Sequence, residues 1–157
     1  MSIGQELLSA IQNGQIVRLK PLVPDFEYRR LYLVSGLYSE IMDNDGDDEH
    51  SQRMAALRAS LEIFITSSTL DRNYIKFLDP ESKGVIEILN KRPKPSLRVF
   101  GMFIEEKKLL LTHFAIRKQL GGWKSYPFKQ EIQKCRQTRS HILPNIRAVT
   151  GDIKDLI

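Results

Sequence analysis

Arg98, His113 and Arg117 are the residues of this sequence whose types best suit chemistry on a phosphodiester. Cleavage of RNA by its own 2′-hydroxyl group needs a group that accepts the hydroxyl proton and cations that stabilise the charge developing on the phosphate. A histidine transfers protons near neutral pH, and an arginine binds phosphate oxygens through two parallel hydrogen bonds. The three residues therefore predict a catalytic site for RNA cleavage, provided that the fold brings them together.

These residues lie on two segments that we expect to form a β-hairpin. The apolar runs on either side of a polar tip at 105–108 have the composition of strands. A loop symmetric about the centre of that tip pairs Arg98 with Ala115 and Phe100 with His113. Because paired residues share a face and side chains alternate along a strand, the two arginines and the histidine then point the same way. A three-residue loop would turn one strand over and break the grouping.

A structural interpretation of the same residues is the alternative. A single histidine in a strand is more often a packed or hydrogen-bonded core residue than a catalytic group, and arginines at the end of a sheet are usually solvated.

Positive charge is concentrated in the second half of the chain. Residues 1–82 carry 8 Lys and Arg against 13 Asp and Glu, whereas residues 83–157 carry 16 against 6. The net charge of the whole chain is +5. A basic half of this kind attracts polyanions, so nucleic acid or an acidic protein is the natural partner.

A strip of basic residues, with one tryptophan among them, lies near the hairpin arginines and indicates where nucleic acid would bind. Its members come from the loop before the hairpin, the segment after it and the last helix: Lys91, Arg92, Lys94, Lys118, Trp123, Lys124, Lys129 and Arg136. Lysine and arginine would bind phosphates, and the aromatic residues Trp123 and Tyr126 would stack on bases. The alternative is an ordinary charged face with Trp123 covering the edge of the core.

The periodicity of apolar residues predicts the elements that hold these side chains. We expect helices over 2–12, 27–42 and 128–142, and another with Met54, Leu57, Leu61, Phe64 and Ile65 on one face. We expect strands over 15–23, 84–89, 97–104 and 108–116, and a short extended segment over 74–78. The order predicts an α+β fold, with an antiparallel sheet of about four strands, two helices in the N-terminal half and a C-terminal helix.

Length and composition predict one soluble cytoplasmic domain over 1–157, with a helical N-terminal extension at 1–13 and a loosely attached tail at 144–157. The lone Cys135 excludes an internal disulfide and is expected in the core. No cofactor, metal or membrane signature is found. The acidic segment 43–49 misses the calcium-loop pattern at its glycine and glutamate positions, so we expect a solvated loop.

The segments VIEIL (85–89), LRVFGMF (97–103) and LLLTHFAIRK (109–118), followed by a basic helix, resemble the RelE/HigB-type toxins of bacterial and phage toxin–antitoxin systems. In this resemblance Glu87 matches the glutamate of the first motif, Arg98 the arginine of the second, and Arg117 and Lys118 the paired basic positions. The family's order of one strand, two helices, three strands and one helix also matches the order expected here. Leu89 stands where the family has an arginine, and the chain is longer than a typical member.

The resemblance implies a ribosome-dependent mRNA endonuclease, independent of metal, that a protein antitoxin neutralises. Arg98 and Arg117 would then hold phosphate, and His113 would move protons. The replacement by Leu89 favours an alternative, a non-catalytic module on the same scaffold that binds nucleic acid or an acidic protein. A third alternative is a homo-oligomer in which the acidic and basic halves dock on each other.

Overall fold

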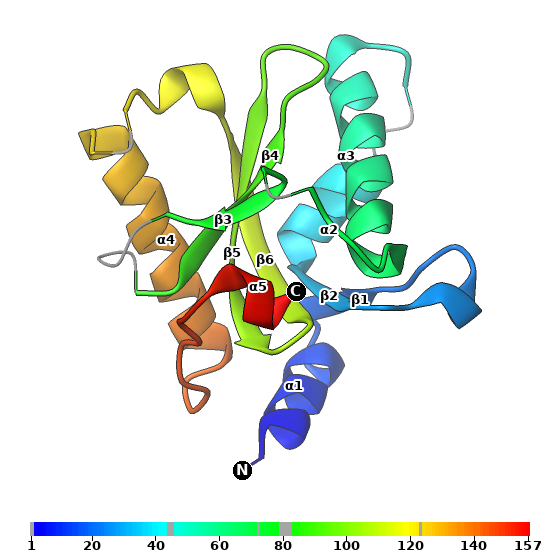
Figure 1. Cartoon of the computed structure of the whole chain (residues 1–157), viewed down its shortest axis with the longest axis vertical. Helices are drawn as coiled ribbons and strands as arrows, with labels where there is room; N and C mark the ends of the chain where they lie inside the picture. Colours follow the sequence, from blue (N-terminus) through cyan, green and yellow to red (C-terminus); the bar gives the residue numbers. More distant parts are fainter. Residues whose placement is uncertain (1, 44–45, 72, 79–82, 123) are drawn as a thin grey trace.

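The computed structural model describes residues 2–43, 46–71, 73–78, 83–122 and 124–157, which form a sheet between two layers of helices (Figure 1). The elements, in chain order, are α1 (Ile3–Gln12), β1 (Ile16–Leu19), η1 (Pro24–Phe26), β2 (Arg30–Val34), α2 (Ser35–Met42), α3 (Glu49–Thr66), β3 (Ile75–Phe77), β4 (Val85–Asn90), β5 (Leu97–Glu105), β6 (Lys108–Ile116), η3 (Arg117–Gln119), α4 (Tyr126–Ile142) and α5 (Ile153–Leu156). Helices α2 and α3 cover one face of the sheet, and α4 covers the other. The expected α+β class is confirmed.

The sheet has six described strands in the order β1-β2-β6-β5-β4-β3. Strands β2 and β6 run parallel, and every other neighbouring pair is antiparallel. The sheet is therefore mixed, and the expectation of about four antiparallel strands describes only part of it. Strands β4, β5 and β6 form the antiparallel meander that the short polar turns of the sequence predict.

The first half of the helix expected over 27–42 is a strand. In β2 the consecutive residues Leu31, Tyr32 and Leu33 are all buried, because both faces of this inner strand are covered. Strands buried on both faces carry continuous apolar runs, and such a run also fits the helical spacing that suggested a helix here. The helix α2 begins only at Ser35.

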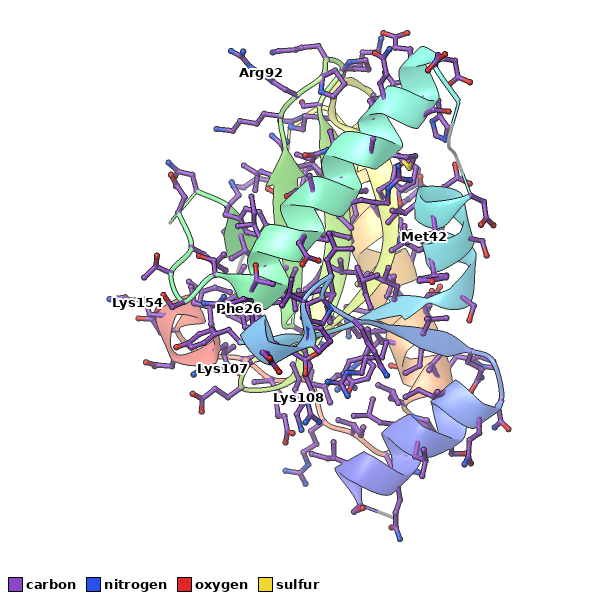
Figure 2. The ribbon with its side chains drawn as sticks, turned by 90° about the vertical axis from the view of Figure 1, so that its right-hand side faces the viewer. Phe26, Met42, Arg92, Lys107, Lys108 and Lys154 are labelled. Carbon is purple, nitrogen blue, oxygen red and sulfur yellow. The ribbon has the colours of Figure 1, made fainter. Side chains whose placement is uncertain are left out.

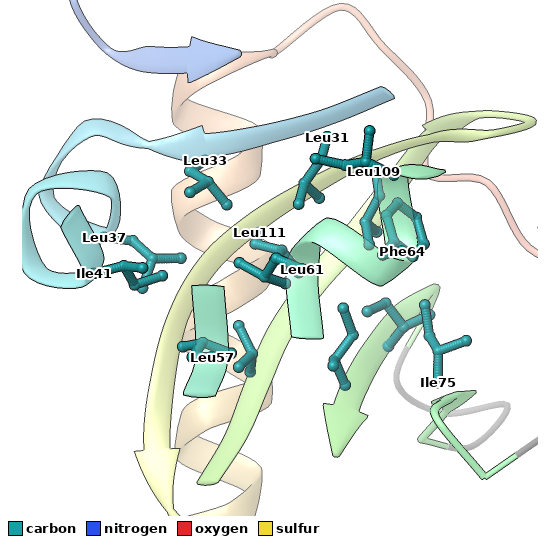
Figure 3. Close-up of a cluster of buried hydrophobic side chains, with 14 of the residues drawn as sticks. Leu31, Leu33, Leu37, Ile41, Leu57, Leu61, Phe64, Ile75, Leu109 and Leu111 are labelled. Atoms are coloured by element: carbon teal, nitrogen blue, oxygen red, sulfur yellow. The ribbon is translucent and has the colours of Figure 1, made fainter. Parts of the chain in front are cut away.

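The main core lies between α2, α3 and the sheet (Figure 3). Leu57 and Leu61 of α3 pack with Leu31 and Leu33 of β2 and with Leu111 of β6. All five residues expected on the inner face of this helix are buried: Met54, Leu57, Leu61, Phe64 and Ile65. None of the described helices is both long and apolar enough to span a membrane.

Both ends of the described chain pack on the rest of the molecule. Leu7 and Ala10 of α1 are buried, and so are Ile146 and Leu156 in the segment that was expected to be loosely attached. The tail also joins the backbone network, because the Lys107 N–H group donates to the Leu156 carbonyl at 2.7 Å. The structure thus differs from the expectation for 144–157, since apolar residues in this segment have partners on the sheet.

The register of the β5–β6 hairpin is the one predicted at the candidate site. Arg98 pairs with Ala115 and Phe100 with His113, but Gly101 pairs with Leu111, which leaves Thr112 as an extra residue in β6. A bulge of this kind interrupts the strict alternation of side chains. A second register shift, between Phe103 and Glu105, restores the original register near the turn.

Gly101 allows the two strands to approach at this bulge. A Cβ atom at position 101 would lie 2.4 Å from the Leu110 carbonyl oxygen and 2.8 Å from Cδ2 of Leu111. Because the nearest atom belongs to the backbone, the contact cannot be relieved by a change of side-chain rotamer. The bulge therefore requires glycine at this position.

We expect Gly101→Ala to lower the free energy of unfolding by roughly 1–3 kcal/mol, because the added methyl group must push β6 away from β5. Denaturation with urea, followed by circular dichroism, measures this loss. Gly4→Ala is the control, since a Cβ atom at Gly4 meets nothing within 4 Å. That variant should be as stable as the wild type or more stable by up to about 1 kcal/mol. Equal stability of the two variants would contradict the role assigned to Gly101.

Candidate functional site

The face of the hairpin that carries His113 lies beneath α4. The His113 ring stacks on the Phe100 ring with centroids 5.1 Å apart, and Phe128 of α4 meets Phe100 edge-on at 5.9 Å. Phe100 and Phe128 belong to a buried cluster that also contains Cys135 of α4. The residues expected to form an open catalytic surface are therefore partly covered by a helix.

Both ring nitrogens of His113 have partners. Nε2 lies 2.6 Å from a carboxylate oxygen of Glu131 on α4, and Nδ1 lies 2.9 Å from the hydroxyl oxygen of Thr112. The side chain of His113 is 12% exposed. A neutral ring with its proton on Nε2 donates to Glu131. Its Nδ1 atom is then an acceptor for the Thr112 hydroxyl, whose one proton is shared between this nitrogen and the Phe100 carbonyl at 3.3 Å.

Burial lowers the pKa of His113 below its ordinary value, because the charged ring would lose its hydration. The Glu131 carboxylate acts in the opposite direction, and the Lys134 ammonium group adds to the lowering. The geometry and the electrostatics together favour a neutral, hydrogen-bonded imidazole that ties α4 to the sheet.

Arg98 is held beside a buried carboxylate. Its Nε atom lies 3.7 Å from Oε2 of Glu87, and Lys76 Nζ lies 3.4 Å from the other carboxylate oxygen. The side chains of Arg98 and Glu87 are 13% and 4% exposed. Burial lowers the pKa of Arg98, the Glu87 charge raises it, and the nearby Arg117 guanidinium lowers it.

Arg117 connects the two loops at this end of the sheet. Its backbone N–H group donates to the Ser96 carbonyl at 2.8 Å, and its Nη1 atom donates to the Gly121 carbonyl at 2.6 Å. Arg117 thus stands where the loop that enters β5 meets the segment that leaves β6. The expectation that Arg117 shares a face with Arg98 required the strand to run on, but β6 ends at Ile116 and Arg117 begins η3. Its charge nevertheless acts on Arg98 and lowers the pKa of that residue.

The predicted nucleic-acid-binding residues gather mainly at this end of the sheet. Exposed members are Lys91, Arg92, Lys94, Lys118, Lys124 and Lys129, whereas Arg136 is half-buried and Trp123 lies outside the described residues. Figure 2 shows Arg92 extending from the β4–β5 loop into solvent. The loop from 91 to 96 and the segment after β6 leave the sheet at the same end, because Leu97 pairs with Ile116.

Several cations in this region differ from many cations elsewhere in forming no ion pair with a described residue. Arg18 pairs with Glu27, and Arg53 lies 3.8 Å from Glu49. Across the described ranges, no ion pair is formed by Lys91, Arg92, Lys94, Lys118, Lys129 or Arg136. The charge asymmetry of the sequence is therefore a local excess of positive charge on the surface.

Two further arginines are buried for structural reasons. Arg29 donates to carbonyl oxygens at the end of α3, including that of Phe64 at 3.1 Å, and Arg139 donates to the Arg147 carbonyl at 2.7 Å. Burial lowers the pKa of both. Their hydrogen bonds go to backbone groups that would otherwise lack partners, so we assign them to the fold.

The described residues hold no cluster of three or more His, Cys, Asp or Glu side chains that would suit a metal ion. Burial raises the pKa of the Cys135 thiol to about 12, so this residue is a core residue, as expected, and no nucleophile. Part of the acidic segment 43–49 lies outside the described residues, and Asp48 caps α3 by accepting from the Ser51 N–H group at 2.8 Å.

Sequence reasoning missed Glu131 and Thr112 as partners of His113. Glu131 lies three residues after the buried Phe128, so its position on the inner side of α4 was visible in the helical spacing. Thr112 reaches the same ring because of the bulge in β6, for which the sequence has no comparable signal.

Comparison of the chain with known protein families, with curated proteins and with solved structures finds no match in any of the three.

The environment of His113 predicts a dependence of stability on pH. The unfolded chain binds a proton at this ring at about pH 6.5, whereas the folded chain binds it at a lower pH. The free energy of unfolding therefore falls as the pH drops below about 6.5, because protons bind the unfolded state more tightly. This loss of stability levels off below the lowered pKa of the folded state. We expect His113→Gln to reduce the decline in the free energy of unfolding between neutral and mildly acidic pH.

Urea denaturation at a series of pH values measures this dependence. His141→Gln is the matched control, because it removes an imidazole that lies exposed on α4. A pH profile of His113→Gln that follows the wild type would contradict the assignment.

Proposed function

We propose that this protein binds RNA through the basic end of its sheet and seats a phosphate between Arg98 and Arg117. The surface around that pair consists of the exposed residues Lys91, Arg92, Lys94, Lys118, Lys124 and Lys129. The observation that carries the proposal is the lack of acidic partners for most of these cations within the described chain. A surface whose charges are not neutralised internally gains most from a polyanion, which releases counterions when it binds.

The two arginines form a suitable phosphate site. Their like charges oppose each other, as the effect of Arg117 on the pKa of Arg98 indicates. A phosphate placed between them would offset this repulsion, because it attracts both guanidinium groups. Arg98 is already ordered by Glu87, so little conformational entropy is lost when it binds.

The arrangement of elements supports a relationship of this protein to RelE-like toxins. The segment from β2 through α2, α3, β4, β5 and β6 to α4 follows the order of that family, with the short β3 inserted before β4. The proposal is thus an RNA-binding protein on a RelE-like scaffold, with β1 and β3 added at the two edges of the sheet.

Binding is favoured over cleavage by the state of His113. A general base must come within hydrogen-bond distance of the proton that it removes. The ring of His113 is stacked on Phe100, bonded at Nε2 to Glu131 and covered by α4. In this arrangement the imidazole has no nitrogen directed at a bound RNA.

Ribosome-dependent cleavage of mRNA, neutralised by an antitoxin, is the second candidate. One observation favours it: the hairpin register places Arg98 and His113 on the same side of the sheet, with Arg117 near Arg98. For this function, α4 would have to move so that the His113–Glu131 bond opens when RNA binds on the ribosome.

RNA binding is tested by replacing the three loop cations together, Lys91→Gln, Arg92→Gln and Lys94→Gln. We expect affinity for single-stranded RNA to fall, and the slope of log K against log salt concentration to become shallower by about 2, because up to three phosphate contacts are lost. Fluorescence anisotropy of a labelled oligonucleotide at several salt concentrations measures both quantities.

A control variant with the same change in net charge is Lys20→Gln, Lys83→Gln and Lys154→Gln, all exposed and outside the loop; the strand β4 separates Lys83 from it. Its salt dependence should stay close to that of the wild type. Equal losses in the two variants would mean that net charge, and no particular surface, drives binding, and this would contradict the proposal.

The second candidate is tested by incubating the protein with a message in a cell-free translation reaction. If His113 transfers protons, the wild type cuts the message and His113→Gln lowers the cleavage rate by about 10²–10⁴-fold, whereas His141→Gln has no effect. Cleavage is followed by primer extension. A message that stays intact in the presence of bound protein would exclude the nuclease and leave the binding proposal standing.

A further inference from the structure

The outward face of α4 carries a shallow groove that shares only Lys129 with the basic surface described above. Its volume is about 570 Å³. The residues that line it are Tyr126, Lys129, Gln130, Gln133, Lys134 and Gln137. They recur at intervals of three and four, so they form one stripe along the helix for about 16 Å. All six are exposed, and none is acidic.

Tyr126 is the most unusual of these residues. Its side chain is 73% exposed at the first position of α4, and its ring stacks on no other ring of the described chain. An exposed aromatic ring beside positive charge is the usual platform for a nucleic-acid base, because every base has a π-face that stacks on it. The fold itself gives this ring no role.

The other lining residues supply what a stacked nucleotide needs. Gln130 and Gln133 lie one turn and two turns from Tyr126, and a glutamine amide both donates and accepts hydrogen bonds, as base edges do. Lys129 and Lys134 flank the stripe with ammonium groups that attract phosphates. Base, base edge and phosphate thus each have a partner of suitable chemistry.

We propose that this groove binds single-stranded RNA, with a base stacked on Tyr126, base edges at Gln130 and Gln133, and phosphates at Lys129 and Lys134. The inference rests on the proposed RNA binding and extends it from the end of the sheet to the outer face of α4. The two surfaces are continuous in the chain, because the segment from Lys118 leads directly into α4. Charge and the N–H donors of the glutamines would also suit an acidic peptide, but a carboxylate makes no use of an exposed ring.

The test compares Tyr126→Ala with Tyr126→Phe in the full chain. The probes are a short labelled oligouridine and the same oligonucleotide without bases. Tyr126→Ala should weaken binding of the oligouridine about tenfold, which is typical for the loss of one stacked base, and Tyr126→Phe should change it by less than about twofold. On the oligonucleotide without bases, Tyr126→Ala and the wild type should bind equally. The salt dependence should not change, because the ring carries no charge.

The outcomes separate this inference from the proposed function. If the wild type fails to bind RNA, both fall. If the wild type binds and Tyr126→Ala binds equally well, the groove is excluded while the sheet-end site stands. An equal loss on both oligonucleotides would show that the ring acts other than by stacking and would overturn the inference. A polyglutamate peptide that competes with RNA and depends on Tyr126 would assign the groove to an acidic protein segment instead.

Discussion

The close approach of β5 and β6 at Gly101 is the constraint on which the rest of the site depends. A carbonyl oxygen of Leu110 occupies the space where any other residue would place its Cβ atom. The approach accommodates an extra residue, Thr112, and so lets both Thr112 and His113 bond on the side of the sheet that α4 covers. Without it, β6 would follow strict alternation, and Thr112 could not contact the imidazole from the same face. The absence of a Cβ atom at Gly101 thus determines which groups surround His113. Because His113 bonds to Glu131, it also fixes the attachment of α4 to the sheet.

The hairpin could be predicted because its polar tip sets the pairing from the turn outward. The pairs Arg98–Ala115 and Phe100–His113 are those that a turn centred between residues 106 and 107 dictates. The two register shifts between the tip and the site were not predictable, and the correct result survives because they cancel. Strand β2 was predicted as a helix because parallel pairing with β6 has no local signature: a run buried on both faces carries neither alternation nor a polar stripe. Local pairing in the hairpin could thus be predicted from the sequence, whereas the elements that pack against a strand could not.

The same distinction applies to the candidate site. The sequence shows an excess of positive charge from residue 83 onward. In the structure much of this charge lies at one end of the sheet, because the β4–β5 loop and the segment after β6 leave the sheet at the same end. Residue types alone could not show which cations are neutralised. Arg18, far along the chain from the strip, meets Glu27 across a connecting loop, whereas Lys91 and Arg92 face solvent. The burial of His113 depends on the path of α4, which helical periodicity predicts as an element but does not place above a particular strand.

The pair formed by Glu87 and Arg98 explains how two guanidinium groups can lie near each other at this end of the sheet. A buried ion pair seldom stabilises a fold more than apolar residues of the same volume would, because both charges lose their hydration. Here the separation of 3.7 Å is loose, and Oε2 of Glu87 accepts no hydrogen bond within the described chain. A carboxylate in this position is poorly justified by stability alone. It does compensate for the repulsion between Arg98 and Arg117, since its charge and that of Arg117 act on Arg98 in opposite directions. In the free protein Glu87 thus serves as the counter-ion that keeps Arg98 charged and ordered beside Arg117.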